Sequence, residues 1–310
     1  MSELSFRVVA CIMCALALAG SDIGAQQVAP EFAHGVDYTF SRAYAKRQVD
    51  DAFDRGTLRL VAYVYRPVKL DRHQVVLFSH GSTGGWTISP REPDGTEPPV
   101  AVIRFFMQRG YTVVAPMRRG VNESSGHYLE ECEYQAGKCT LEQNTALFDL
   151  GLREAALDSM AVIDQIIEGR LVPKNTPILL AGISRGGFLS FAIAAKRPEL
   201  AKGMLSFVGG WLSITDQWPP ELNARREALQ TNALRSFASR AKAPSLWIYA
   251  ERDPYYSEAT TRRFFEAFKD GGGNGDYVFI TDPGLANGHA VASRLSLWGS
   301  SADAFLARFL

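Results

Sequence analysis

Short apolar runs separated by longer amphipathic stretches extend along most of this 310-residue chain. The apolar runs lie at 58–65, 75–79, 111–115, 178–181, 204–208, 246–250 and 277–280. Most are continuous, which is typical of strands buried on both faces of a sheet. The first run alternates instead, which predicts an edge strand ending at Arg66-Pro67. Because helical patterns separate the runs, we expect an α/β fold with a mostly parallel sheet and helices on both faces.

Helices are expected at about 100–109, 146–171, 187–195, 261–269 and 290–309, with a short polar helix between 208 and 246. From Met117 to about Asn144 the periodicity stops, and this polar segment is too long for an ordinary strand-to-helix connection. We therefore interpret 117–144 as an excursion beside a functional site. Residues 26–56 are an N-terminal arm to which the pattern assigns no element. No repeat interrupts residues 57–310, which predicts one domain there.

The N-terminus has the pattern of a secretory signal peptide. Arg7 precedes the apolar stretch 8–19, and small residues follow as far as Ala25. We expect residues 1–25 to be removed by cleavage after Ala25, with an earlier small-residue site at 17–19 as the alternative. The apolar stretch is shorter than the about 20 residues that span a bilayer. The sequence therefore predicts an exported protein, periplasmic or secreted, without stable membrane insertion.

The overall composition is that of an ordinary globular protein, with 46% hydrophobic residues. The 33 basic and 33 acidic residues give a formal net charge of zero. This balance supplies no charge excess to attract nucleic acid or an anionic membrane, and it argues against both as partners. A small neutral or apolar substrate fits better. The oligomeric state leaves no signal in the sequence.

Two cysteines, Cys132 and Cys139, lie outside the predicted signal peptide, and both fall in the excursion. Close spacing in an exported chain predicts a local disulfide between them. A zinc site is poorly supported, because the surrounding sequence offers only His127 and acidic residues and no Cys-x-x-Cys spacing.

The segment Gly182-Ile183-Ser184-Arg185-Gly186 lies between the apolar run at 178–181 and the helical pattern at 187–195. A strand that turns sharply into a helix with serine at the bend presents the serine hydroxyl outside the packed sheet. We expect so tight a turn that a Cβ at Gly182 or Gly186 would collide with the backbone, and strained dihedral angles at the serine. These features predict that Ser184 is a nucleophile.

A serine nucleophile needs an imidazole base, and the base needs a carboxylate that fixes its tautomer. His289 is the one histidine that follows Ser184 in the sequence, so it is the predicted base. Asp253 follows the apolar run at 246–250, and the carboxyl end of that strand would place it at the site as the predicted acid. The alternatives for the acid are Asp282, Glu251 and Asp216.

The oxyanion hole is expected to combine two backbone N–H groups. One belongs to Arg185, the residue after the nucleophile. The other comes from the glycine-containing loop 79–85, in which Ser82 is the first candidate donor and Gly81 the second. His80 precedes the nucleophile, which is the wrong chain order for the base, so we expect it to hold this loop.

Substrate-binding residues have a weaker signal. Arg118 follows a strand end and is a candidate for binding a substrate carboxylate. The alternatives for Arg118 are a solvent-exposed side chain or an ion pair with Glu123 or Glu130. Aromatic candidates for the pocket wall, which in most proteins belong to the core, are Trp86, Trp211, Trp218 and Phe106.

Together these motifs resemble the α/β-hydrolase superfamily, particularly its dienelactone-hydrolase-like and prolyl-oligopeptidase-like branches. The matching motifs are His80-Gly81 after a buried strand, the Ser184 turn, Glu251-Arg252-Asp253 and Gly288-His289, which together cover about 58–310. The resemblance implies an α/β-hydrolase catalytic domain at 57–310 with a triad of Ser184, Asp253 and His289. This chain departs from the dienelactone hydrolases proper, because they use a cysteine as nucleophile where this chain has Ser184.

The activity implied is that of an exported serine hydrolase that cleaves a carboxylic ester and needs neither a cofactor nor a metal. A serine peptidase acting on short peptides is one alternative, because both reactions use an acyl-enzyme. It would require an anchor for a charged substrate terminus, for which the candidates are Glu130, Glu131, Glu133 and Arg118. A non-catalytic binding module with the same fold is the other alternative.

Overall fold

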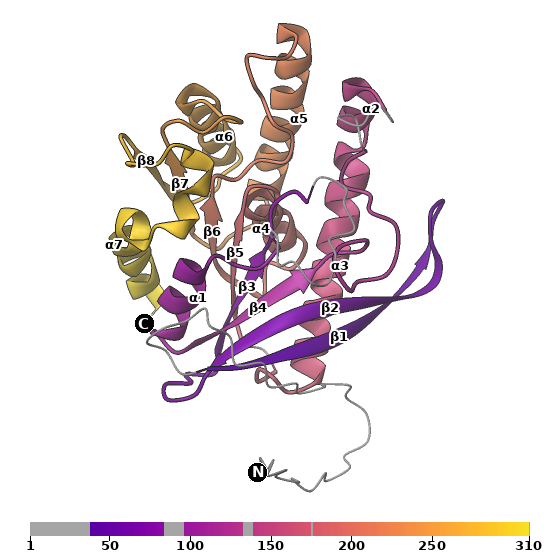
Figure 1. Cartoon of the computed structure of the whole chain (residues 1–310), viewed down its shortest axis with the longest axis vertical. Coiled ribbons are helices and arrows are strands. Elements are labelled where there is room, and N and C mark those ends of the chain that lie inside the picture. The colour runs from indigo at the N-terminus through magenta and orange to yellow at the C-terminus, as the bar shows by residue number, and fades with distance from the viewer. Residues whose placement is uncertain (1–37, 84–95, 133–138, 175, 310) are drawn as a thin grey trace, which may run out of the picture.

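An eight-stranded sheet forms the centre of the molecule (Figure 1). The computed structural model describes residues 38–83, 96–132, 139–174 and 176–309. The strands are β1 (Tyr38–Asp50), β2 (Arg55–Pro67), β3 (Gln74–Ser79), β4 (Tyr111–Met117), β5 (Ile178–Ile183), β6 (Ala201–Phe207), β7 (Ser245–Ala250) and β8 (Gly275–Ile280). They lie in the order β1-β2-β4-β3-β5-β6-β7-β8. The six strands β3 to β8 are parallel to one another, while β2 is antiparallel to both β1 and β4. The predicted mostly parallel sheet is confirmed.

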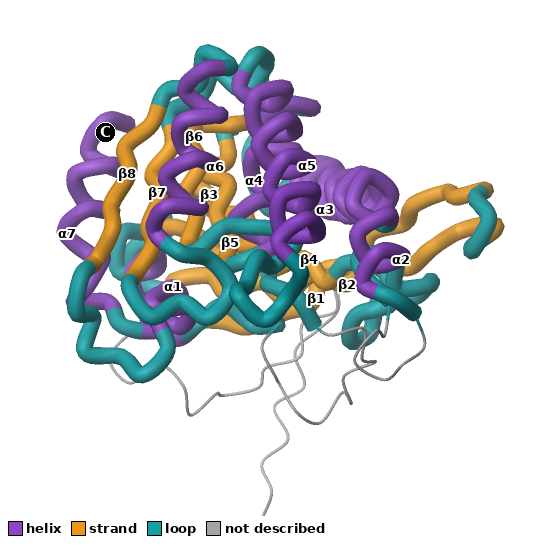
Figure 2. Tube along the Cα trace, turned by 90° about the horizontal axis from the view of Figure 1, so that it is seen from above, coloured by secondary structure: helices purple, strands orange, loops and turns teal. Residues whose placement is uncertain are grey.

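Helices cover both faces of this sheet, as predicted (Figure 2). They are α1 (Val100–Met107), α2 (Leu141–Ala146), α3 (Phe148–Glu168), α4 (Arg185–Lys196), α5 (Pro220–Ala238), α6 (Glu258–Asp270) and α7 (Leu295–Leu306), with the short 3-10 helices η1 (Gly288–Ser293) and η2 (Ala307–Phe309). On one face α1 packs against α7, and on the other α3, α4, α5 and α6 lie side by side. Every helix in the described ranges is too short or too polar to cross a membrane.

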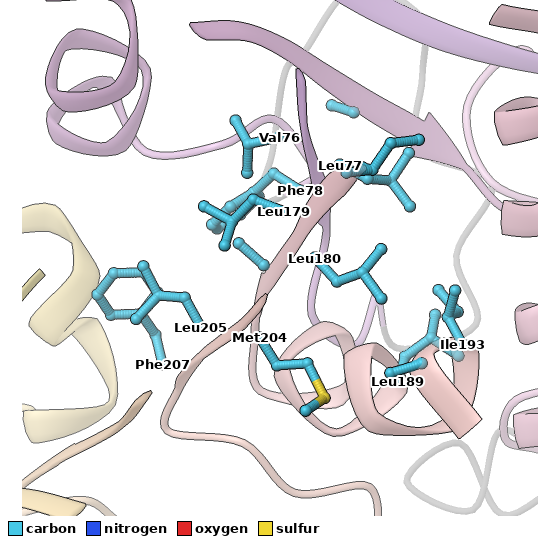
Figure 3. Close-up of a cluster of buried hydrophobic side chains, with 14 of the residues drawn as sticks. Val76, Leu77, Phe78, Leu179, Leu180, Leu189, Ile193, Met204, Leu205 and Phe207 are labelled. Carbon is cyan, nitrogen blue, oxygen red and sulfur yellow. The ribbon is translucent and has the colours of Figure 1, made fainter. Parts of the chain in front are cut away.

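The centre of the core lies around β3, β5 and β6, whose side chains alternate between the two faces of the sheet. Figure 3 shows Leu180 and Met204 pointing toward Leu189 of α4, whereas Leu179 and Leu205 point to the opposite face. All five of these side chains are at most 2% exposed. Burial on both faces explains why these strands are continuous apolar runs in the sequence.

The N-terminal arm contains a strand that the sequence pattern did not assign. β1 pairs with β2 along its whole length, beginning with Tyr38 opposite Pro67. The prediction that the run at 58–65 is an edge strand is therefore wrong, because β1 covers β2 and residues 60–65 are buried. The buried positions of β1 are Ala43, Ala45 and Val49. Small inward residues of this kind give little apolar signal.

Three of the expected helices differ from the structure by more than a few terminal residues. The expected helix at 146–171 is α3, and it is preceded by the separate helix α2, whose N-cap Thr140 forms a capping box with Gln143. The polar helix expected between 208 and 246 is α5, which is 19 residues long rather than short. The expected final helix is divided into η1, α7 and η2, because Arg294 between η1 and α7 has an extended backbone. His289 lies in η1, ahead of this break.

Candidate active site

The turn between β5 and α4 holds Ser184 in a strained conformation. Its φ of 54° and ψ of −121° lie in a region that residues with a Cβ rarely adopt. A Cβ on Gly182 would lie 2.3 Å from the backbone carbon of Gly186, and a Cβ on Gly186 would lie 1.9 Å from the Ser79 carbonyl oxygen. The collisions and the strain predicted for this turn are confirmed. The N–H of Ser184 donates to the Phe207 carbonyl at 2.9 Å, which attaches the turn to the end of β6.

Replacing Gly186 with alanine should destabilise the fold, because the colliding Ser79 carbonyl belongs to the rigid backbone of β3. We expect the free energy of unfolding to fall by about 3 kcal/mol or more, measured by chemical denaturation. Gly299→Ala is the matched control, since its Cβ would meet only the flexible Leu295 side chain, at 3.1 Å, in a helix that favours alanine. Equal stability of the two variants would contradict this account of the turn.

Asp253 and His289 form a hydrogen-bonded pair at the same edge of the sheet. The His289 Nδ1 donates to Asp253 Oδ2 at 2.8 Å. The Asp253 side chain is 1% exposed and that of His289 is 15% exposed. Asp253 Oδ1 accepts the backbone N–H groups of Tyr255 and Tyr256, at 2.8 and 3.3 Å. These two N–H groups fix the orientation of the carboxylate. Because His289 carries its proton on Nδ1, toward Asp253, its other nitrogen, Nε2, is available to accept a proton.

The loops that carry this pair are fastened to each other. The N–H of Gly288 donates to the Arg252 carbonyl at 3.0 Å, and a Cβ on Gly288 would lie 2.1 Å from the Glu251 carbonyl oxygen. Asn287 Oδ1 accepts the N–H of His289 at 2.9 Å. The close approach requires glycine before the histidine and sets its position relative to Asp253. Ser184, Asp253 and His289 follow β5, β7 and β8, so the parallel sheet directs all three to one edge.

The alternative acids have other partners in the structure. Asp282 lies beside Arg252 at 3.4 Å, and its side chain is 83% exposed. Glu251 Oε2 accepts the N–H of Asp282 at 3.0 Å. Asp216 is exposed in the segment between β6 and α5. Asp253 is thus the carboxylate that contacts the imidazole.

The expected oxyanion donors lie on either side of Ser184. Arg185 is the first residue of α4, where a backbone N–H has no partner within the helix. On the other side, a Cβ on Gly81 would lie 3.3 Å from Ser184 Cβ, so the loop after β3 reaches the serine. Gly81 and Ser82 both remain candidates for the second donor.

Arg118 supports that loop from within the protein. It is 1% exposed, and its guanidinium forms a two-point ion pair with the buried Glu130. It also donates to the carbonyls of His80 and Gly81, at 3.0 and 3.2 Å. Of the alternatives considered for Arg118, the structure shows the ion pair with Glu130. This pairing corrects the assignment of Arg118 to substrate binding, because its donors are used inside the chain.

His80 is fully buried beside Arg118, and its Nδ1 donates to the Gly81 carbonyl at 2.8 Å. Burial and the neighbouring Arg118 lower the pKa of His80 well below its ordinary value. The ring is therefore neutral at physiological pH, and it holds the loop as expected from the sequence.

The aromatic candidates have mixed outcomes. Trp86 lies outside the described residues. Trp211 is 1% exposed and lies under the Arg185 guanidinium, 5.5 Å from the ring centre, so it packs beneath the turn. Phe106 is buried in α1 against Tyr111, and the Arg226 guanidinium lies 4.3 Å from the ring centre of Trp218. The structure adds Tyr255, which is 42% exposed and whose ring packs edge to face with that of His289, the ring centres 4.7 Å apart.

Comparison with known proteins gives matches among solved structures. No family model and no curated protein sequence matches the chain. The esterase Pf2001 of Pyrococcus furiosus aligns with a TM-score of 0.57 and 15% identity over 94% of this chain and 99% of its own. Est1E of Butyrivibrio proteoclasticus, solved with ferulic acid, aligns with a TM-score of 0.53 and 18% identity over 81% of this chain and 95% of its own.

The acylaminoacyl peptidase of Pyrococcus horikoshii aligns with a TM-score of 0.56 and 19% identity over 87% of this chain. The aligned region is 41% of the peptidase, so this chain corresponds to less than half of it. The backbones of these solved structures align with most of the fold described above. This chain has the α/β-hydrolase fold.

Within this α/β-hydrolase fold, the excursion after β4 lies against the Ser184 turn. Cys132 and Cys139 form a disulfide, which confirms the predicted pairing. Immediately before it, Glu131 Oε2 accepts from the Arg185 guanidinium at 2.6 Å. A role for Glu131 with Arg185 was not foreseen. The sequence offered an arginine next to Ser184 and two adjacent acids, Glu130 and Glu131, but sequence alone does not pair them.

A metal site finds no support in the part of the chain that the structure describes. There, no group of three or more histidine, cysteine, aspartate or glutamate side chains is arranged to hold an ion. At the sheet edge that also carries the Ser184 turn, the Asp253–His289 pair is suited to proton transfer to and from a hydroxyl.

Proposed function

We propose that this chain is a serine hydrolase that cleaves a carboxylic ester through an acyl-enzyme on Ser184. The observation that carries the proposal is the 2.8 Å Asp253–His289 hydrogen bond at the same sheet edge as the strained Ser184 turn. The α/β-hydrolase neighbours include esterases and acylaminoacyl peptidases, which supports hydrolysis as the class of reaction.

The chemistry assigned to each residue follows from its contacts. Ser184 Oγ attacks the ester carbonyl while His289 Nε2 takes its proton, and the buried Asp253 stabilises the imidazolium that forms. The N–H of Arg185 and an N–H of Gly81 or Ser82 stabilise the oxyanion. The imidazolium then protonates the departing alkoxide, and water activated by His289 hydrolyses the acyl-enzyme.

Hydrolysis of short peptides is the second candidate, and the ion pairs of the excursion weigh against it. A peptidase that recognises a charged substrate terminus needs a carboxylate or guanidinium directed at the substrate. Glu130 is paired with Arg118, and Glu131 is bonded to Arg185 and Ser82. Glu133 lies outside the described residues. The charged groups named as anchors that the structure describes are thus used within the chain, which favours a neutral ester.

Export through the predicted signal peptide completes the proposal. Its structural support is the Cys132–Cys139 disulfide, because such bonds persist in oxidising compartments. The proposed site of action is therefore the periplasm or the medium, with a small ester as substrate.

Ester and amide substrates assayed side by side test the reaction. Purified protein is assayed with p-nitrophenyl esters of short acids, with aminoacyl p-nitroanilides and with an N-acetylated peptide. Serine peptidases also cleave activated esters, so hydrolysis of the amide bond is the discriminating readout. We expect turnover of the esters and none of the amides. Comparable kcat/KM on an amide would establish the peptidase instead, and absence of all turnover would support the binding module.

A further inference from the structure

A single carboxylate contacts the side chains of both leading oxyanion-donor candidates. Glu131 Oε1 accepts the Ser82 hydroxyl at 2.7 Å, and Glu131 Oε2 accepts the Arg185 guanidinium at 2.6 Å. Ser82 lies on the loop after β3, and Arg185 is the first residue of α4. The contacts therefore connect two segments that approach the nucleophile from opposite sides. We refer to Glu131 with these two partners as the Glu131 bridge.

The bridge is buried and ionised. The Glu131 side chain is 9% exposed and that of Arg185 is 7% exposed. Burial alone would raise the pKa of Glu131, but the charge of Arg185 and the hydrogen bonds of Ser82, Arg185 and Tyr128 outweigh it, so the pKa is lowered. The pKa of Arg185 is raised, because the nearby Glu131 outweighs the effect of burial. The ion pair thus persists at neutral pH and weakens only as the pH falls below the ordinary range of glutamate.

The segment that carries Glu131 is itself held firmly. A Cβ on Gly151 would lie 2.7 Å from both the Glu130 Cα and the Leu129 carbonyl oxygen, so this segment rests directly on α3. The preceding Glu130 is paired with Arg118, and the following residue, Cys132, is in the disulfide. Arg185 makes a further bond to the Trp211 carbonyl at 3.0 Å. The bridge therefore connects supported elements and has little freedom to shift.

We propose that Glu131 is a positioning residue that fixes the separation of the two oxyanion donors, an inference that rests on the proposed ester hydrolysis. Preorganised donors act on the charge that develops in the transition state. Displacing them should lower kcat and leave ground-state binding, and hence KM, nearly unchanged. Glu131 touches neither the substrate nor Ser184 in this scheme, and it acts through Ser82 and Arg185.

Kinetics of Glu131→Ala, Glu131→Gln and Ser82→Ala on a p-nitrophenyl ester test the proposal. We expect Glu131→Ala to lower kcat about 10- to 100-fold, less than the loss caused by removing a donor outright, with KM within about twofold. Glu131→Gln should recover part of the loss, because it keeps an acceptor for Ser82. Ser82→Ala keeps its backbone N–H, so its kcat should fall less than that of Glu131→Ala. The double variant should have the same kcat as Glu131→Ala alone, because both changes break the same contact. The matched control is Glu123→Ala, which removes a partly exposed pair with Arg42 on the same excursion.

A second readout separates positioning from general structure. A trifluoromethyl ketone forms an oxyanion on the serine, so its inhibition constant should rise by the factor by which kcat/KM falls. Wild-type kcat in correctly folded Glu131→Ala, or a loss confined to KM, would overturn the inference. If that variant does not fold, unchanged kcat in Ser82→Ala overturns it instead. These failures are distinct from failure of the proposed function, in which the wild-type protein itself would neither turn over esters nor react at Ser184.

Discussion

Replacement of Ser184 with alanine is expected to lower kcat for ester hydrolysis by about five to six orders of magnitude. The loss is large because the change removes the atom that forms the acyl-enzyme, and the Asp253–His289 pair then has no hydroxyl to activate. The fold should be retained, because alanine lacks only the hydroxyl. Both residues carry a Cβ, so the backbone strain at this position is the same in the two proteins. Steady-state kinetics beside thermal unfolding measure the two effects separately.

Ser239→Ala is the control for this change, because Ser239 is an exposed serine at the end of α5. It should have wild-type kcat. Retention of more than a thousandth of the wild-type kcat by Ser184→Ala, in protein free of contaminating esterase, would show that another group is the nucleophile.

The second large effect is expected for Asp253→Asn, with a fall in kcat of about 10⁴-fold. The backbone N–H groups of Tyr255 and Tyr256 both donate to Asp253 Oδ1, so they would retain the amide oxygen of asparagine at that position. The amide nitrogen would then face His289 Nδ1, where it is a donor. His289 would have to accept at Nδ1 and carry its proton on Nε2, which is the wrong tautomer for a base.

Asp282→Asn is the matched control for this change. It alters the alternative acid, whose side chain is 83% exposed and lies beside Arg252. We expect its kcat to stay within about twofold of wild type, since an exposed pair of this kind contributes little. The opposite ranking of the two variants would move the role of the acid from Asp253 to Asp282.

The sequence predicted the sheet well, because strands buried on both faces are continuous apolar runs in the sequence. It predicted less of β1, whose buried positions are alanines and one valine, and whose other face carries charged residues such as Arg42 and Lys46. The division of the last helix also left no signal in the sequence, because the break occurs at an arginine, Arg294, rather than at a glycine or proline. At such places, packing against distant elements decides the local structure.

At the candidate site, local chemistry was easier to predict than pairing. The Ser184 turn is determined by five consecutive residues, and its geometry could be anticipated from the two glycines. The partners of Arg118 and Arg185 depend on how the excursion after β4 folds back onto the sheet edge. Arg118 could therefore be described only by alternatives, and the contact of Glu131 with Arg185, 54 residues away, could not be derived from spacing.

The most direct test of the central claim is covalent labelling of the purified protein with a fluorophosphonate, with the modified peptide identified by mass spectrometry. An activated serine beside a base reacts with this probe, whereas ordinary serines do not. The account predicts labelling at Ser184 in wild-type protein, slower labelling in Asp253→Asn and none in Ser184→Ala. Labelling at a different serine, or no labelling of correctly folded protein, would contradict it.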